Sequence, residues 1–256
     1  AIFVNKSFPA DSITVTDLTL RFPVYGVDSK SLKKHLARIT VGGKLGKTGL
    51  GAPEITALSK VNLQLRSGDR LGLIGHNGSG KTTLLRALAG AYEPDEGTID
   101  VHGRIAAMLD LNLGIDPSAT GLDNIRLRGR IAGLSTRQID ERLTEIAEFT
   151  GLGPFLAMPL KTYSAGMQAR LAFAVATAVE ADVILMDEWI AVGDSDFKKL
   201  AHKRILDLME RAGILVLASH ELDLIRLYCN KVMRIEAGVA SPIMDVKRLD
   251  ELLAAA

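Results

Sequence analysis

A glycine-rich octapeptide, Gly75-His-Asn-Gly-Ser-Gly-Lys-Thr82, separates an apolar segment from a helix-forming one. The residues before it, 70–74, predict a short buried strand, and the residues after it, 83–89, predict a helix. A strand, a glycine loop and a helix in this order form a P-loop, in which backbone N–H groups converge on phosphate oxygens at the helix N-terminus. The alternative, a glycine-rich turn without a ligand, requires three independent signals to agree by chance.

Each residue type in this loop has a different role in binding a nucleotide. Glycines let the backbone approach the phosphates, Lys81 reaches the outer phosphates, and the Thr82 hydroxyl can bind Mg²⁺. We therefore predict that the nucleotide is bound by Gly75, His76, Asn77, Gly78, Ser79, Gly80, Lys81, Thr82 and Thr83.

Composition excludes several other classes of protein. A formal net charge of +1 leaves no electrostatic footprint for nucleic acid, and the single Cys229 excludes an internal disulfide framework. The longest uncharged run, 149–160, is too short to span a bilayer, and residues 1–6 lack the apolar region of a secretory signal. We therefore expect a chain without a membrane span that is not exported, and 256 residues suit one α/β domain with subdomains.

Hydrophobic periodicity indicates a mixed α/β fold around a parallel sheet. Strands are predicted at residues 12–22, 61–65, 98–101, 183–186 and 214–217. The last two are continuous apolar runs, which are typical of strands buried on both faces of a parallel sheet. A glycine- and lysine-rich insertion separates the first two strands at about 26–53. Residues 120–159 are predicted to be mainly helical, with a capping box at Ser135 and Gln138.

Polar side chains follow both of the buried apolar runs. Asp187 and Glu188 end the first run, and His220 follows the second. Open α/β sheets bind ligands at the carboxyl ends of their strands, so Asp187 is expected to hold Mg²⁺ and Glu188 to polarise the attacking water. His220 can contact the terminal phosphate and orient that water. Without the P-loop, two solvated acids and a neutral histidine would explain the same residues.

The segment Tyr163-Ser-Ala-Gly-Met-Gln168, followed by a small-residue helix over 169–179, completes a pattern. With the P-loop, the hydrophobic-Asp-Glu strand and the strand-end His220, the chain resembles the nucleotide-binding subunit of ABC transporters over nearly its whole length. The resemblance implies one ABC ATP-binding domain over 1–256, of P-loop NTPase type. It implies a mainly parallel core sheet, an antiparallel β edge and a helical subdomain at about 110–163.

In that family, the corresponding signature reads Leu-Ser-Gly-Gly-Gln, whereas here Tyr163 stands in place of the leucine, and Ala165 and Met167 replace two of the later positions. The resemblance implies that Ser164, Gly166 and Met167 bind the terminal phosphate of ATP held by a second copy. It also makes Asp194 the aspartate that contacts the partner across this dimer. The alternative for Ser164 is a simple helix N-cap.

The particular residues within these motifs resemble those of one branch of the ABC family. Arg-Leu-Ala-Phe-Ala-Val-Ala at 170–176 and Asp-Glu-Trp-Ile-Ala-Val-Gly-Asp at 187–194, followed by Phe197, are similar to the ATPases of polysaccharide exporters for O-antigen, galactan, capsule or teichoic acid. This resemblance implies hydrolysis of ATP with Mg²⁺, two transmembrane permease subunits, a lipid-linked polysaccharide as cargo, and a peripheral place on the cytoplasmic face of the cell membrane. The alternatives are an ABC ATPase for another cargo and a soluble ABC ATPase outside transport.

Two features depart from the common ABC pattern, and the adenine contact is a further expectation from the resemblance. The residues after the predicted strand at 105–109 read Asp110-Leu-Asn-Leu in place of the usual glutamine, so its Mg²⁺-contacting role passes to Asp110 or Asn112. Tyr25, rather than Phe22, is expected to stack on adenine. The insertion at about 26–53 predicts either a basic amphipathic helix that guides a lipid-linked substrate or a mobile glycine-rich loop.

Overall fold

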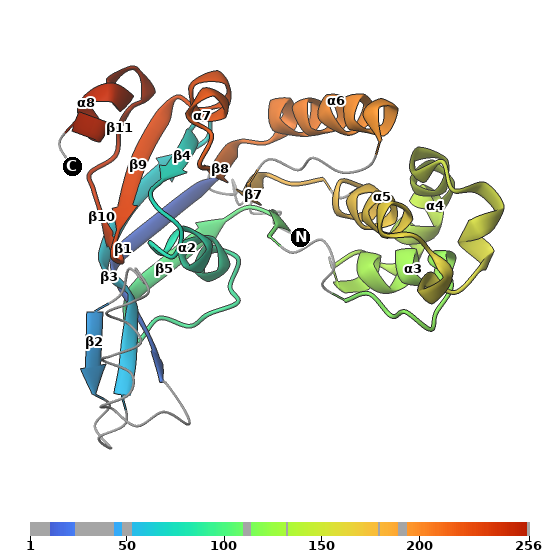
Figure 1. Ribbon diagram of the computed structural model, residues 1–256, viewed down its shortest axis with the longest axis horizontal. Coiled ribbons are helices and arrows are strands. Elements are labelled where there is room, and N and C mark those ends of the chain that lie inside the picture. The colour runs from blue at the N-terminus through green and yellow to red at the C-terminus, as the bar shows by residue number, and fades with distance from the viewer. Residues whose placement is uncertain are drawn as a thin grey trace, which may run out of the picture. The chain divides into compact units, whose positions relative to one another are not determined.

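The computed structural model describes residues 11–23, 44–47, 53–109, 114–131, 133–178, 180–188 and 194–254. Two compact units make up this part of the chain (Figure 1). The first comprises the described parts of Ala1–Gly103, Leu185–Trp189 and Gly213–Ala256, and the second those of Arg104–Ile184 and Ile190–Ala212. Among the described residues, no helix has the length and hydropathy needed to cross a membrane.

An antiparallel sheet in the first unit contains the N-terminal strands. Its order is β2-β3-β1-β5. The strands are β1 (Ser12–Pro23), β2 (Lys44–Lys47), β3 (Pro53–Arg66) and β5 (Glu96–His102). Alternating side chains of β1, beginning with Ile13 and Val15, are buried, which explains the period of two in the sequence. This sheet confirms the predicted antiparallel edge, and β2 places a strand within the inserted segment.

A second sheet contains the buried parallel strands, in the order β10-β9-β4-β8-β7-β6. The strands are β4 (Arg70–Ile74), β6 (Ile105–Met108), β7 (Val183–Asp187), β8 (Ile214–Ala218), β9 (Lys231–Glu236) and β10 (Val239–Ala240). β4 pairs in parallel with both β8 and β9, and all residues of β8 are buried. Both continuous apolar runs are therefore buried strands of this sheet, and β8 runs parallel to β4, as predicted. The short β11 (Met244–Asp245) pairs antiparallel with β9.

Helices of the first unit flank these sheets (Figure 1). α2 (Lys81–Leu88) begins directly after the glycine loop and packs against β3, β5 and β8. α7 (Leu222–Tyr228) packs against β4. The C-terminal part consists of a 3₁₀ turn, η3 (Val246–Arg248), and α8 (Leu249–Ala254). The loop that begins at Gly75 is therefore held between a buried strand and a packed helix.

The second unit is mainly helical. Its helices are α3 (Gly121–Ile131), α4 (Thr136–Thr150), α5 (Ala165–Ala176) and α6 (Ser195–Arg211), with 3₁₀ turns η1 (Gly153–Ala157) and η2 (Leu160–Thr162). The predicted capping box is present, because the Ser135 side chain accepts from the Gln138 N–H and the Gln138 side chain accepts from the Ser135 N–H. Apolar residues of α3, α4 and α5 share one core, including Ile125, Ile146 and Leu171.

The C-terminal end of α5 differs from the helix predicted over 169–179. The helix ends at Ala176, and the Thr177 hydroxyl donates to the Phe173 carbonyl at 2.8 Å. A hydroxyl that bonds back to the preceding turn competes with continuation of a helix. The predicted adenine-stacking Tyr25, the metal-ligand candidates Asp110 and Asn112, and the basic helix proposed within 26–53 lie outside the described residues.

Candidate functional site

The glycine loop has a backbone that only glycine can adopt without strain. Gly75 has φ +146° and Gly80 has φ +118°, both in the region that side chains disfavour. A Cβ on Gly75 would lie 2.1 Å from the carbonyl oxygen of Ile235 in β9. The loop is therefore pressed against the neighbouring strand, and its outer side is left for a ligand.

Lys81 is a buried cation at the start of α2. Its exposure is 7%, and Nζ donates to the Gly75 carbonyl at 2.8 Å and to the His76 carbonyl at 3.1 Å. Within the described residues Lys81 forms no ion pair with a carboxylate. A buried ammonium balanced only by two carbonyl dipoles has capacity for an anion, because its desolvation cost is not yet offset by an opposite charge.

The N-terminus of α2 is also open to an anion. Gly80 caps the helix without a side-chain hydrogen bond, so the first N–H groups of the helix are left to a ligand or solvent. The Ser79 hydroxyl is fully buried and has no hydrogen-bond partner among the described residues. A glycine cradle, a buried cation and an unpaired hydroxyl together fit a chain of phosphates.

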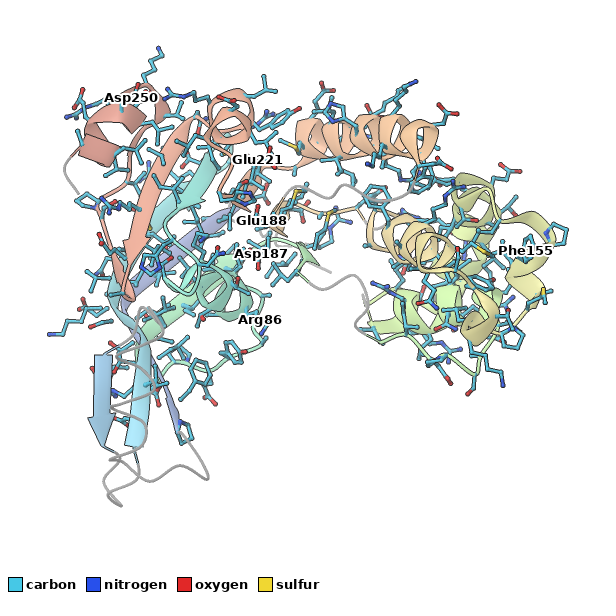
Figure 2. All side chains as sticks on the ribbon, viewed as in Figure 1. Arg86, Phe155, Asp187, Glu188, Glu221 and Asp250 are labelled. Carbon is cyan, nitrogen blue, oxygen red and sulfur yellow. The ribbon has the colours of Figure 1, made fainter. Side chains whose placement is uncertain are left out.

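Thr82 and Asp187 bring two oxygen donors together beside this loop. The Thr82 hydroxyl donates to the Asp187 carboxylate with an Oγ1–Oδ2 distance of 2.6 Å. Asp187 is the last residue of β7, and Figure 2 labels it beside Glu188 in the first unit. Carboxylate and hydroxyl oxygens are ligands that suit Mg²⁺, which is usually held by one or two protein groups plus phosphates. This pair therefore fits the predicted metal position.

Glu188 is held in an unusual backbone conformation at the end of β7. Its φ is +66°, which is rare for a residue with a side chain and costs about 1–3 kcal/mol. The Glu188 N–H donates to the Ala218 carbonyl at 2.8 Å. Its Oε2 accepts from the Ser219 hydroxyl at 3.2 Å and lies 3.0 Å from Nδ1 of His220. The residue with the strained backbone is therefore also the one whose carboxylate is held by both Ser219 and His220.

His220 responds to this carboxylate. The hydrogen bond and the charge of Glu188 raise the pKa of His220 above its ordinary value. The side chain of His220 is largely exposed, so its ring can reach a ligand while Nδ1 stays on Glu188. The structure thus brings together the two residues that were assigned to the attacking water.

Ser219, which the sequence did not single out, contacts the Glu188 carboxylate. It is fully buried, and its hydroxyl donates to Glu188 while accepting from the Glu221 N–H at 3.1 Å. It therefore ties the Glu188 carboxylate to the turn that carries His220. The sequence did offer one indication, because Ser219 stands between a continuous apolar run and the polar His220. A serine buried at such a position needs a hydrogen-bond partner.

The segment at 163–167 begins α5 in the second unit. The Ser164 hydroxyl accepts from the Met167 N–H at 3.2 Å, so Ser164 is the N-cap of α5. Ser164 and Gly166 are both exposed. Tyr163 is buried at 6% exposure, and its hydroxyl donates to the Phe155 carbonyl at 2.6 Å. An exposed helix N-terminus on a buried aromatic anchor can present N–H groups to an anion.

Asp194 begins the next helix of the same unit. Its carboxylate accepts from the Phe197 N–H at 3.0 Å, which makes it the N-cap of α6, and it forms an ion pair with Arg170 of α5. The predicted residues therefore fall into two groups. Gly75 to Thr83, with Asp187, Glu188 and His220, belong to the first unit, and the 164–167 segment and Asp194 belong to the second.

A change of Gly75 to Ala is expected to disable the loop. The added Cβ would collide with the Ile235 carbonyl in a strained φ region, and we expect a loss of about 2–4 kcal/mol of stability or an equivalent displacement of the loop. Gly78→Ala is the matched control, because its Cβ would meet nothing within 4 Å although φ is +76°. Thermal unfolding and binding of a fluorescent ATP analogue measure both variants. Equal behaviour of the two variants would contradict the close-approach explanation.

Comparison with known proteins gives one consistent picture. The family model described as "ABC transporter" matches residues 58–191. The O-antigen export system ATP-binding protein RfbE of Yersinia enterocolitica is 40% identical over 228 residues, covering 89% of this chain and 95% of that protein. RfbB of Myxococcus xanthus, also an O-antigen export system ATP-binding protein, is 42% identical over 72% of this chain, but the match spans only 42% of that longer protein.

Relatives from another polysaccharide system and solved structures agree with this result. The teichoic acids export ATP-binding protein TagH of Bacillus anthracis is 33% identical, covering 75% of this chain and 35% of TagH. A dimeric ATP-binding cassette bound to ADP and phosphate matches with a TM-score of 0.66 at 20% identity, covering 91% of this chain and 98% of that one. An ATP-binding subunit of an ABC transporter matches with a TM-score of 0.67 at 20% identity over 94% and 93% of the two chains. These structures share the fold.

Proposed function

The chain belongs to the ABC transporter family of ATPases, and on this premise we propose that it drives export of a lipid-linked polysaccharide across the cytoplasmic membrane. One observation carries the chemistry: a buried Lys81 and an open helix N-terminus adjoin the paired Thr82 and Asp187 in one unit. Two observations support a polysaccharide as the cargo: the residues within the motifs, and the export systems after which the relatives are named.

In the proposed site, the glycine loop binds the phosphates of ATP. Gly75 to Gly80 supply backbone N–H groups, and Lys81 exchanges one of its carbonyl partners for a phosphate oxygen. Thr82 and Asp187 would hold Mg²⁺, which neutralises charge on the phosphates when it is bound.

Hydrolysis then requires a water molecule held in line with the terminal phosphate. We assign its polarisation to Glu188, whose carboxylate is fixed by Ser219 and His220. His220 has an exposed ring that can orient the terminal phosphate. A positioned carboxylate contributes about 10²- to 10⁴-fold to such a step.

We further propose that the site is completed by a second copy. Ser164 and Gly166 are exposed at the N-terminus of α5, beside the partly buried Met167, and this N-terminus suits the terminal phosphate of ATP held on the P-loop of the other copy. Two copies would then enclose two ATP molecules. The described units, with the inserted segment at about 26–53, would make up one ABC domain over 1–256, whose helical subdomain includes α3, α4 and α5.

Membrane attachment follows from this proposal. Two transmembrane permease subunits would carry the polysaccharide, and this chain would lie against them as a peripheral subunit on the cytoplasmic face. The second candidate is an ABC ATPase for another cargo, because the ATP site itself carries no information about a sugar. No observation on the described residues favours a soluble role outside transport.

Export in living cells tests the cargo class. Deleting the gene in its host and restoring either the wild-type chain or Glu188→Gln should give surface polysaccharide only with the wild-type chain. Lipid-linked polysaccharide should accumulate inside cells that carry Glu188→Gln, because assembly continues while transport stops. Unchanged surface polysaccharide in the deletion strain would exclude this cargo and favour the second candidate.

A further inference from the structure

Arg170 lies in the second turn of α5 and contacts the start of α6. Its Nη2 forms an ion pair with Oδ2 of Asp194, 24 residues away in the sequence. Its guanidinium carbon lies 5.0 Å from the ring centre of Phe197, the residue whose N–H donates to Asp194. One arginine therefore contacts both the cap of α6 and a side chain in its first turn.

Asp194 makes two contacts within its own chain. Oδ1 accepts from the Phe197 N–H at 3.0 Å and Oδ2 accepts from Arg170. The Phe197 N–H and the nearby Arg170 together lower the pKa of Asp194, which keeps its charge in place. These two contacts fix Asp194 at the start of its own helix.

Arg170 lies over an aromatic cluster formed by Phe149, Phe173 and Phe197. Phe197 is 5% exposed, and its ring packs edge-on against Phe173 of α5 at 6.0 Å and Phe149 of α4 at 5.6 Å. Aromatic pairs at these distances have defined orientations. Arg170 therefore binds to a surface that α4, α5 and α6 build together.

We propose that Arg170 is a positioning residue that joins the signature helix α5 to the start of α6, so that Ser164, Gly166 and the Asp194 segment meet the nucleotide of a second copy as one rigid piece. The inference rests on the proposed pairing of two copies around ATP. It assigns to Asp194 a role in its own chain, exerted through Arg170, which lies outside both the 163–168 and the 187–194 segments.

The chemistry of arginine suits this role. A guanidinium can pair with a carboxylate and stack on an aromatic ring at the same time, whereas the ammonium of lysine is a single point charge. Arg170→Lys should therefore keep the charge but lose most of the positioning. Because Asp194 is mostly exposed, the ion pair itself contributes little to overall stability, and the effect should appear in pairing rather than in unfolding.

Pairing in a hydrolysis-deficient parent tests the inference. In the Glu188→Gln background, sedimentation equilibrium with MgATP should show pairing about tenfold weaker for both Arg170→Gln and Arg170→Lys, a size typical of coupling between sites. The affinity of the single chain for MgATP should stay at the parent value, because the P-loop belongs to the other unit.

Arg204 supplies a matched control in the same unit. Its guanidinium lies 4.6 Å from the ring centre of Phe149, and it pairs with Glu145 at 2.9 Å, so it makes the same two kinds of contact with the same aromatic cluster. It contacts neither Ser164 nor Asp194 in any described interaction. Arg204→Gln should pair as the parent does. Equal weakening by Arg204→Gln, or normal pairing by Arg170→Gln, would overturn the inference.

A double-mutant cycle tests whether Asp194 acts through Arg170. Asn is nearly as good an N-cap as Asp, so Asp194→Asn keeps the cap of α6 and removes the charge. Adding Arg170→Gln to Asp194→Asn should weaken pairing no further, whereas additive losses would show that the two residues act separately. Failure of the Glu188→Gln parent itself to pair with MgATP would overturn the proposed function, and this inference with it.

Discussion

Glu188→Gln is expected to slow ATP hydrolysis by about 10²- to 10⁴-fold while leaving ATP binding intact. The substitution keeps the shape of the side chain and its hydrogen-bonding capacity toward Ser219 and His220, but it removes the carboxylate that polarises the water. Steady-state release of phosphate, together with the dissociation constant of ATP, separates the two effects. A loss of kcat with an unchanged dissociation constant is the expected result.

Glu221→Gln is the matched control for this experiment. Glu221 is also a glutamate beside His220, and Figure 2 labels it in the same unit, yet the contact it makes with Ser219 uses only its backbone N–H. We expect its turnover to remain near that of the wild-type chain. Wild-type turnover in Glu188→Gln would show that another group activates the water, and the assignment of Glu188 would be wrong.

Lys81→Ala should weaken ATP binding by roughly 10- to 100-fold, because a hydrogen bond to a charged group contributes about 1.5–3 kcal/mol. The buried ammonium is held by the Gly75 and His76 carbonyls in the orientation that a phosphate would meet. Without it, phosphate binding relies on backbone N–H groups alone. Calorimetric titration with MgATP measures the change directly.

A comparison with AMP makes the Lys81 experiment more specific. Lys81 is expected to reach the outer phosphates, so the loss should be larger for ATP than for AMP. Lys247→Ala, which removes a charge from the exposed η3 turn, serves as the control and should bind ATP normally. Unchanged ATP affinity and turnover in Lys81→Ala would contradict the P-loop assignment.

Much of the fold follows from local sequence patterns. The apolar runs become the buried strands β7 and β8, and the helix after the glycine loop is α2. The Ser135 and Gln138 pair forms the expected capping box. Each of these features depends on residues that are close together in the sequence, so a single sequence is enough to predict it.

Contacts between distant residues were not predictable in the same way. Ser219 acquires its role only because β8 places it beside Glu188, 31 residues earlier, and Arg170 meets Asp194 only after α5 and α6 pack on one aromatic cluster. The left-handed backbone of Glu188 was also hidden, because glutamate has no preference for that conformation. Local patterns identify the motifs, whereas tertiary packing decides which side chains support them.

A measurement of ATP-driven pairing tests most directly the proposal that two copies share each ATP site. In the Glu188→Gln background, sedimentation equilibrium should show dimers with MgATP and monomers with MgADP, because only ATP offers a terminal phosphate to Ser164 and Gly166. Ser164→Asp should abolish this pairing by repelling that phosphate, while Ser164→Asn should retain it, since both residues cap a helix well. Equal pairing with MgADP, or pairing that survives Ser164→Asp, would contradict the shared site.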